Sequence, residues 1–403
     1  MRFLTAGESH GEALIGIVEG CPAGVPLTAD AINTQLRRRW IGFGRGGRAK
    51  IEQDAVHIYS GVRFSRTMGS PIALRIDNAA YHRDKASWPS VMAVDGDGEG
   101  IEPVTQPRPG HADLVGVQKY RLDDIRPVIE RASARETAMR VACCTVARVF
   151  LEAVGIRINS HVLQIGSVSG ETGDAATNGS TEDAEATATR RLVREMLADY
   201  PDAINLNADK SEVRMLDFEL AARAVEHIKE AKSAGDTLGG RYEVIVTGVP
   251  AGLGSYVHWD RRLDGQLAQA IMSIQAQKAV EIGDGVASAR RPGSRVHDEI
   301  MPGLARATNH AGGIEGGVSN GMPIVIRGYM KPIPTLIKPL QSVDLATGEA
   351  GATRYERSDV TSVPAASVVA EAVVALTIAN ALLDKVGGDS LQEIVERVGM
   401  PDE

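Results

Sequence analysis

The feature that most constrains the fold is an apolar run at residues 364–383, which approaches the length of a membrane-spanning helix. A bilayer span needs about 20 apolar residues, and a charged side chain inside one is costly. Glu371 and Asn380 interrupt this run. The sequence therefore predicts a long helix buried in a protein core and no membrane association, and the 403-residue chain is long enough to supply a large core.

The beginning of the chain and its cysteines indicate a cytoplasmic protein. The first residues, MRFLTAGESHG, contain no apolar run of signal-peptide length before the chain turns polar. Cys21, Cys143 and Cys144 form neither a metal-binding C-x-x-C pattern nor an even disulfide framework. We therefore expect a reducing compartment and no metal site.

The net charge restricts the classes of ligand. At −8 it argues against a general nucleic-acid binder, because such proteins carry a basic excess that displaces phosphate counterions. Any anion site in this chain must therefore be local.

A short internal similarity bears on the domain organisation. GCPAGV at 20–25 and GVPAGL at 248–253 each follow an apolar strand pattern and precede a helix pattern. Either the match is a coincidence, or residues 1–403 form one domain of two pseudo-symmetric halves. Helices are predicted after Thr28, which can act as an N-cap, and at 137–155, 190–198, 218–233 and 263–274. The polar stretch at 169–188 has no period and is predicted to be a mobile insertion.

Two segments between residues 108 and 140 concentrate charged side chains. RPGHAD at 108–113 is a turn that presents the imidazole of His111. In the segment 130–140 a continuous helix would place Arg131 and Arg135 on one side and rotate Arg140 away. These arginines form either a solvated, salt-bridged face or an anion site. Glu130 and Glu136 are expected to stay structural by pairing with these arginines.

Glycine-rich segments elsewhere are also basic. The loop GFGRGGR at 42–48 follows a helix pattern and lacks the dinucleotide-binding spacing, so a Rossmann site is rejected. It is either a loop that folds over a polyanion or a merely exposed loop. The glycine-dense stretch at 309–321 and the segment at 331–335 suit close approach to a phosphate and a flat ring.

Several of these segments, taken in chain order, resemble the chorismate synthase family. They are GESHG at 7–11, GRG at 44–46, RPGHAD at 108–113, RASARET at 131–137, GDTLGG at 235–240, VEIG at 280–283, RVHDE at 295–299 and KP at 331–332. The resemblance implies a 1,4-anti elimination of phosphate from 5-enolpyruvylshikimate 3-phosphate, which gives chorismate in the shikimate pathway of aromatic amino acid biosynthesis. The family requires reduced FMN without net redox change.

The resemblance also implies roles for individual residues. The residues expected to bind the anionic substrate are Arg39, Arg45, Arg48, Arg135 and Arg357. The residues expected to hold FMN are Arg131, Ala132, Ser133, Gln275, Ala276, Gly316, Lys331, Pro332, Ile333, Pro334, Thr335 and Arg357. His10 is expected to protonate the departing phosphate and His111 to lie beside the flavin. Asp359, with Ser9 and Ser133, is expected to support proton removal near the flavin.

Further expectations follow from the family. It implies an α+β fold in which helices are sandwiched between antiparallel sheets, and a homotetramer. Some members reduce their flavin with NADPH, and Arg39 and Arg45 match positions that contact this nucleotide. The run of Arg37, Arg38 and Arg39 departs from the usual spacing, which leaves each of them a candidate for the ligand, and Phe43 replaces a frequent tyrosine.

Two other functions remain open from the residues. An FMN- and NADPH-dependent oxidoreductase would use the same basic pocket for net hydride transfer. A non-enzymatic polyanion or nucleic-acid binder would use the Gly/Arg loops, although the acidic net charge disfavours it.

Overall fold

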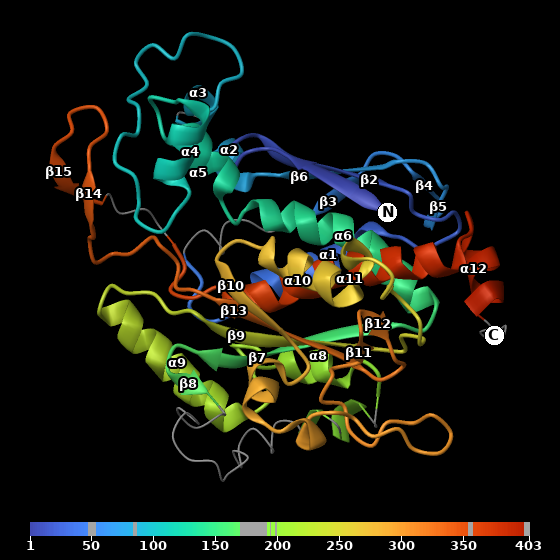
Figure 1. Ribbon diagram of the computed structural model, residues 1–403. Coiled ribbons are helices and arrows are strands. Elements are labelled where there is room, and N and C mark those ends of the chain that lie inside the picture. The colour runs from blue at the N-terminus through green and yellow to red at the C-terminus, as the bar shows by residue number, and fades with distance from the viewer. Residues whose placement is uncertain are drawn as a thin grey trace.

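The fold has three layers, in which two antiparallel sheets enclose a layer of helices (Figure 1). The computed structural model describes residues 1–46, 54–83, 87–169, 192–193, 195–197, 200–353 and 358–398. This architecture is the α+β sandwich that the family resemblance implied.

Each sheet is built from a different part of the chain, the first from residues 2–77 and the second from residues 157–330. The four-stranded sheet has the order β1 (Arg2–Ala6), β2 (Ala13–Glu19), β6 (Ile72–Asp77), β3 (Val56–Ile58). The five-stranded sheet has the order β10 (Gln277–Ile282), β13 (Ile324–Met330), β9 (Gly240–Thr247), β7 (Arg157–Ile165), β8 (Val168–Ser169). In β2 the side chains alternate between buried and exposed, as a strand with one face on a core requires.

The middle layer consists of long helices. They are α1 (Ala29–Trp40), α6 (Glu136–Ala153), α10 (Leu263–Met272) and α11 (Val363–Val386). α6 packs on β1, β2 and β6 of the first sheet, and α11 packs on β7, β9 and β13 of the second. Because α6 and α11 also pack on each other, one continuous core joins both sheets.

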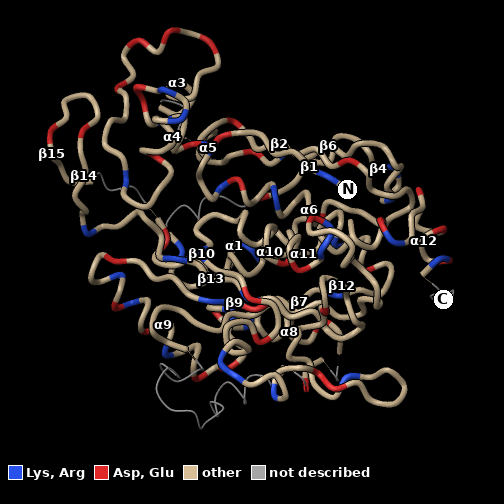
Figure 2. The backbone as a smooth tube through the Cα atoms, in the orientation of Figure 1, with Lys and Arg blue, Asp and Glu red and all other residues tan. Residues whose placement is uncertain are grey.

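The helix α11 contains the apolar run from which the sequence predicted a buried core helix, and this prediction is confirmed. Among the described residues, it is the helix whose length and composition would suit a membrane span, yet 78% of its apolar window is buried inside the protein. Glu371 points into this core with only 1% of its side chain exposed. Figure 2 shows basic and acidic residues near each other in this middle layer around α11.

Both sheets follow one strand order. β1 pairs with β2, β2 with β6 and β6 with β3, while β7 pairs with β9, β9 with β13 and β13 with β10. α1 follows β2 as α10 follows β9, and α6 follows β6 as α11 follows β13. The similar turns at 20–25 and 248–253 therefore occupy equivalent places in this order.

Shorter elements surround the sandwich. On the outer side of the second sheet, α8 (Ala203–Ala208) packs on β7 and α9 (Phe218–Ser233) on β8. The remaining helices are α2 (Ala79–Arg83), α3 (Trp88–Val91), α4 (Asp113–Tyr120), α5 (Arg126–Ala132), α12 (Leu391–Val398) and the 3-10 turns η2 (Trp259–Arg261), η3 (Gly285–Arg290) and η4 (Gly293–Arg295). The hairpins pair β4 (Val62–Arg63) with β5 (Arg66–Thr67), β11 (Ile314–Glu315) with β12 (Val318–Ser319), and β14 (Gln341–Val343) with β15 (Ala350–Ala352).

Most helices lie where the sequence predicted them. The predicted helices at 137–155, 218–233 and 263–274 correspond to α6, α9 and α10. The polar insertion predicted at 169–188 lies outside the described residues, apart from Ser169 at the end of β8, as does part of the helix predicted at 190–198.

Residues 130–140 do not form the continuous helix considered from the sequence. α5 ends at Ala132, and the extended backbone of Ser133 (φ −60°, ψ 140°) separates it from α6, which begins at Glu136. Arg131 and Arg135 therefore do not share a helix face. Arg131 donates to the backbone oxygens of Thr5 and Gly7, whereas Arg135 donates to other partners described below.

The N-cap of α1 provides a first testable prediction. Thr28 has extended backbone angles, and its hydroxyl accepts a 3.1 Å hydrogen bond from the Ala31 N–H. Thr28→Ala is expected to lower the free energy of unfolding by about 1 kcal/mol, because this N–H loses its partner. Denaturant unfolding measures the change, and Thr34→Ala, inside the same helix, is expected to change it by less than about 0.5 kcal/mol. Equal effects of the two substitutions would contradict a capping role.

Candidate functional site

His10 lies in the turn between β1 and β2, where a buried carboxylate holds it. Its Nδ1 lies 3.0 Å from both carboxylate oxygens of Glu130, and its backbone N–H donates to Glu130 Oε2 at 2.7 Å. The ring stacks on Trp88 with centroids 3.8 Å apart and an interplanar angle of 8°. Ser9 donates its backbone N–H to the Glu130 carbonyl at 3.1 Å. The imidazole plane and one ring nitrogen are thereby fixed.

Glu130 is ionised in this environment although its side chain is fully buried. Burial favours the neutral acid, but the hydrogen bonds and charge of His10, with the charge of Arg126, outweigh it and lower the pKa of Glu130. Arg126 Nη1 lies 3.4 Å from Glu130 Oε1 one helical turn away. Glu130 was predicted to remain structural by pairing with the nearby arginines, and its contact with His10 gives it a place in the site.

His111 has a similar environment in the turn before α4. Its Nδ1 lies 2.5 Å from Asp113 Oδ1, and the Asp113 side chain is fully buried. Arg108 donates to Asp113 Oδ2 through Nε at 2.8 Å and through its backbone N–H at 3.0 Å. Burial opposes ionisation of Asp113, but the hydrogen bonds from His111 and Arg108 prevail and hold its pKa well below the usual range.

Two arginines predicted to bind the substrate converge on one buried carboxylate. Arg135 Nη1 lies 2.5 Å from Asp54 Oδ1, and Arg39 Nη1 lies 3.5 Å from Asp54 Oδ2. Arg39 also donates to the hydroxyl of Thr137 at 3.0 Å and the carbonyl of Ala134 at 3.2 Å. Burial lowers the pKa of Arg39 to about 10, although the Asp54 charge opposes this shift. The contacts select Arg39 from its run, because Arg38 binds Glu371 and Arg37 lies at the surface with Asp30.

Arg45 lies beside this pair and contacts Asp359. Its Nη1 is 2.8 Å from Asp359 Oδ2, and the backbone N–H of Gly46 donates to Asp359 Oδ1 at 2.6 Å. The hydroxyl of Ser362 donates to the same carboxylate at 2.9 Å. Arg48 and Arg357, the other two arginines expected at the substrate, lie outside the described residues.

Asn78 joins the His10 turn to the arginines. Its side-chain nitrogen donates to the carbonyls of Gly11 at 2.7 Å and Glu8 at 3.1 Å, and its Oδ1 accepts from Arg135 Nε at 2.9 Å. Neither Asn78 nor Asp54 was predicted from the sequence. Each is a single polar residue without a local motif, and only long-range contacts give it a role.

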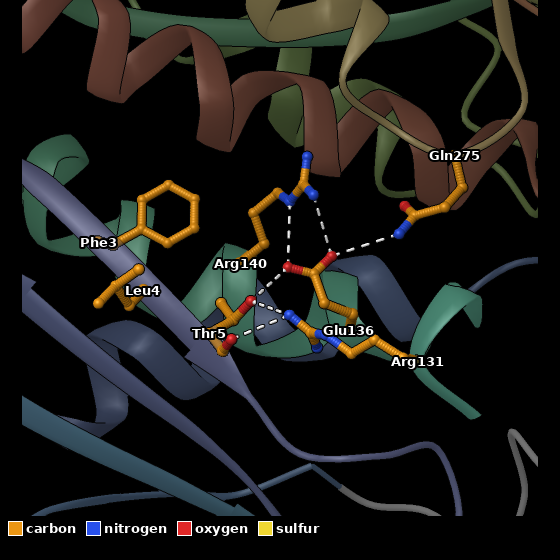
Figure 3. Close-up of a pocket in the computed structure, with 7 residues that line it drawn as sticks. All are labelled: Phe3, Leu4, Thr5, Arg131, Glu136, Arg140 and Gln275. Carbon is orange, nitrogen blue, oxygen red and sulfur yellow. Dashed lines mark hydrogen bonds and ion pairs between the residues drawn. The ribbon is translucent and has the colours of Figure 1, made fainter. Parts of the chain in front are cut away.

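A pocket of about 380 Å³ brings together two of the residues predicted to hold the cofactor (Figure 3). Arg131 and Gln275 line it together with Phe3, Leu4, Thr5, Glu136 and Arg140. Arg140 Nη2 lies 3.1 Å from Glu136 Oε2, and Gln275 donates to the same oxygen at 3.4 Å. The Gln275 Oε1 atom is buried without a hydrogen-bond partner among the described residues. The pocket is therefore lined by two guanidinium groups and by an amide oxygen that has no hydrogen-bond partner among the described residues.

The segment at 331–335 connects this pocket to the His111 turn. The Lys331 N–H donates to the Ala276 carbonyl at 3.0 Å, and its ammonium group donates to the Gly110 carbonyl. Arg108 Nη1 donates to the hydroxyl of Thr335 at 3.1 Å, and the Thr335 carbonyl accepts from the Ser358 hydroxyl at 2.8 Å. The other predicted cofactor residues lie next to these contacts in the sequence. They are Ala132 and Ser133, which follow Arg131, and Pro332, Ile333 and Pro334, which lie between Lys331 and Thr335. Contacts thus run from the pocket through His111 to Asp359 and Arg45.

Gly316 is the described residue of the predicted site that these contacts do not include. Its neighbour Gly317 accepts from the Leu263 N–H at the start of α10, whereas Gln275 follows the other end of this helix. Ten helical residues span roughly 15 Å, so Gly316 lies well away from Gln275 within one chain. Its assignment to the cofactor stays a prediction.

The described residues contain no group of three or more His, Cys, Asp or Glu side chains arranged to hold a metal ion. The cysteines are all buried and free, and burial raises the pKa of Cys21 to about 11 and that of Cys144 to about 12. These thiols are therefore protonated at neutral pH and have no part in the site chemistry.

Comparison with known proteins identifies the family of this chain. The family model described as chorismate synthase matches residues 1–383. Chorismate synthase of Salinibacter ruber is 61% identical over 405 residues, which cover 99% of this chain and 98% of the relative. That of Chlorobaculum tepidum is 55% identical and covers 99% and 96% of the two chains. A crystal structure of chorismate synthase has a TM-score of 0.73 at 41% identity and covers 99% of this chain and 96% of that one. The chain therefore belongs to the chorismate synthase family.

Proposed function

We propose that this site carries out the reaction of the family, the 1,4-anti elimination of phosphate from 5-enolpyruvylshikimate 3-phosphate, as a lyase of the shikimate pathway. The observation that carries the proposal is the convergence of Arg39 and Arg135 on Asp54, which Asn78 joins to the turn of His10. A cluster of cations and a histidine held by a buried carboxylate near it are what the departure of a phosphate group requires.

The substrate carries two carboxylates and a phosphate, and the arginine cluster suits this charge. Arg39, Arg45 and Arg135 gather around the carboxylates of Asp54 and Asp359. Arg48 and Arg357 are proposed to join this cluster as further donors to the substrate. Each charge-assisted hydrogen bond to the ligand contributes about 1.5–3 kcal/mol. Several such bonds offset the desolvation of the trianion.

His10 is the proposed donor of the proton to the leaving phosphate. Asn78 connects the turn that carries His10 directly to Arg135 of the cationic cluster. His111 is proposed to lie at the cofactor, because the Lys331 ammonium group contacts the residue before it. Asp359, with Ser9 and Ser133, is proposed to support removal of the substrate proton.

The residues around the 380 Å³ pocket fit FMN. Arg131 and Arg140 provide donors for its phosphate, and the buried Gln275 amide and the nearby Lys331 provide polar partners for its ring system. When bound and reduced, FMN supplies an electron-rich ring that assists the elimination without net oxidation. The protein groups position this ring against the substrate and exclude water.

We further propose a cytoplasmic homotetramer in which NADPH, if it serves as reductant, contacts Arg39 and Arg45. Exposed Leu4, Ile15 and Ile17 on the outer face of the first sheet support association of subunits, since Leu4 and Ile17 are register partners in β1 and β2.

The shared strand order of the two sheets supports a chain of two related halves.

One assay separates this function from the two alternatives. Purified protein is incubated anaerobically with reduced FMN and 5-enolpyruvylshikimate 3-phosphate, and phosphate, chorismate and flavin absorbance are followed. The proposed function predicts release of phosphate and chorismate with the flavin still reduced. Stoichiometric flavin oxidation would instead indicate an oxidoreductase, and salt-sensitive DNA binding without turnover would indicate a polyanion binder.

Removing either imidazole is expected to abolish most of the turnover. His10→Ala and His111→Ala should each lower kcat by about 10²-fold or more, because a positioned general acid or base is lost. Circular dichroism should remain unchanged, since both rings are partly exposed at turns. Near-normal kcat in both variants would remove the imidazoles from the mechanism. His258→Ala, at an exposed histidine outside the site, serves as the control.

A further inference from the structure

The two histidines of the site share one arrangement of partners. In each, a carboxylate with a fully buried side chain lies against the histidine Nδ1 and also forms an ion pair with an arginine. The groups are Arg126, Glu130 and His10 in one case and Arg108, Asp113 and His111 in the other. The imidazoles themselves are 21% and 17% exposed, so each ring joins a buried charge to the site surface.

The protonation of these groups follows from their hydrogen-bonding capacity. The pKa values of Glu130 and Asp113 are both lowered, so both groups are carboxylates that only accept hydrogen bonds. A nitrogen 2.5–3.0 Å from such an oxygen must carry the hydrogen atom. Nδ1 is therefore the protonated nitrogen in both rings, and Nε2 is the nitrogen that exchanges a proton with the ligand.

The arginines orient the carboxylates and offset part of their charge. Arg108 approaches both oxygens of Asp113, at 2.8 Å through Nε and 3.1 Å through Nη2. Arg126 reaches Glu130 with one longer contact of 3.4 Å. The arginine therefore offsets less of the negative charge of Glu130, beside His10, than of Asp113, beside His111.

A surface pair shows what the local turn alone provides. His258 Nδ1 lies 2.8 Å from Asp260 Oδ1, with the same two-residue spacing as His111 and Asp113. Both of its side chains are 57% exposed, and water screens such a contact. The same spacing thus arises locally without burial of the carboxylate. Buried carboxylates that hold a histidine and pair with an arginine also occur at His310–Asp284–Arg291 and His161–Glu243–Arg327, so the proposed role of His10 and His111 rests on their place in the candidate site.

We propose that Asp113 and Glu130 are positioning residues that hold His111 and His10 in the Nδ1–H tautomer for proton transfer at Nε2. This inference rests on the function proposed above. Among the residues that the structure describes, the charged groups near the two rings include Arg126 and Arg108, with Lys331 at the carbonyl of Gly110 and Arg135 reached through Asn78.

Asp113→Asn tests the tautomer directly. Asp113 Oδ2 accepts two hydrogen bonds from Arg108, which can only donate, so the asparagine oxygen must take that position. Its NH₂ group then faces His111 Nδ1, which must become an acceptor, and the hydrogen atom moves to Nε2. Nitrogen-15 NMR of histidine-labelled full-length protein, at a pH high enough that the His111 signals no longer change with pH, distinguishes the two neutral tautomers. His111→Gln assigns the resonance.

We expect the Nδ1–H form in the unsubstituted protein, the Nε2–H form in Asp113→Asn, and a kcat lowered by about 10²-fold with KM changed by less than about threefold. The unsubstituted protein tests the proposal even if the variant does not fold, because an Nε2–H tautomer of His111 there would overturn it. A folded Asp113→Asn with an unchanged tautomer and full kcat would overturn it as well. Asp260→Asn, the matched surface substitution, is expected to leave kcat unchanged.

The result also distinguishes this inference from the proposed function. If His111→Gln has full activity, the role of His111 in the reaction falls, whatever its tautomer. If His111→Gln is inactive while Asp113→Asn retains full kcat, only the positioning role of Asp113 falls. Glu130→Gln provides the same comparison for His10.

Discussion

Replacing Glu371 with glutamine is expected to lower the free energy of unfolding by about 3–5 kcal/mol, because buried arginines would lose their counter-charge. Arg38 binds both oxygens of Glu371 at 2.7 and 2.8 Å, and Arg148 binds Oε2 at 2.6 Å. Arg214 lies 3.3 Å away, and the Ser160 hydroxyl donates at 2.5 Å. A neutral amide supplies one acceptor where the carboxylate supplies two, and it also brings donors toward the guanidinium groups.

The effect is measurable by denaturant unfolding, and its pH dependence has a definite sign. Burial opposes ionisation of Glu371, but the charges of Arg38, Arg148 and Arg214 lower its pKa from 4.5 to about 2. Because the folded pKa is lower than the unfolded one, this stabilisation is present above about pH 4.5 and is lost as the pH falls toward 2. Glu371→Gln should lack this part of the acid sensitivity.

Glu152 provides the matched control. It accepts from the Nε of the same Arg148 at 2.9 Å, but 37% of its side chain is exposed. Glu152→Gln is expected to change the free energy of unfolding by less than about 1 kcal/mol. Equal stability losses for the two substitutions would show that the cluster around Glu371 is not the reason.

Arg135→Ala is expected to lower kcat/KM for 5-enolpyruvylshikimate 3-phosphate by about 10²–10⁴-fold. Two charge-assisted hydrogen bonds to the anion, each of about 1.5–3 kcal/mol, would be lost. The guanidinium group is held at the site by Asn78 and Asp54, so its position does not depend on the ligand. The loss should therefore appear in both kcat and KM.

Anaerobic turnover with reduced FMN measures this effect, and an unchanged unfolding midpoint excludes a loss of the fold. Asn78 keeps its bonds to the Gly11 and Glu8 carbonyls without Arg135, and Asp54 keeps Arg39. Arg2→Ala, at an arginine whose side chain is 82% exposed, is the control and should retain full activity. A kcat/KM for Arg135→Ala within threefold of the unsubstituted protein would place the substrate elsewhere.

Contacts local in the sequence were predictable, and long-range contacts were not. Thr28 caps α1, and His111 meets Asp113 two residues away, so both features follow from a short stretch of chain. Asp54 and Asn78 contact Arg135 from 81 and 57 positions away, and no local pattern distinguishes them from other polar residues. Glu130 was expected to pair with the arginines of its own segment, and it does contact the nearby Arg126, but it also lies against His10, 120 positions away.

The sequence by itself determined that a long apolar helix lies inside a large core, that any anion site must be local, and that motifs of one enzyme family occur in order. Those properties follow from composition, periodicity and short motifs, which require no knowledge of distant neighbours. Only the tertiary structure decided which arginine of the run 37–39 enters the site, how the break at Ser133 separates Arg131 from Arg135, and which carboxylate holds each histidine. The physical reason is that these choices depend on how the helices of the middle layer bring remote segments together and remove water from between them.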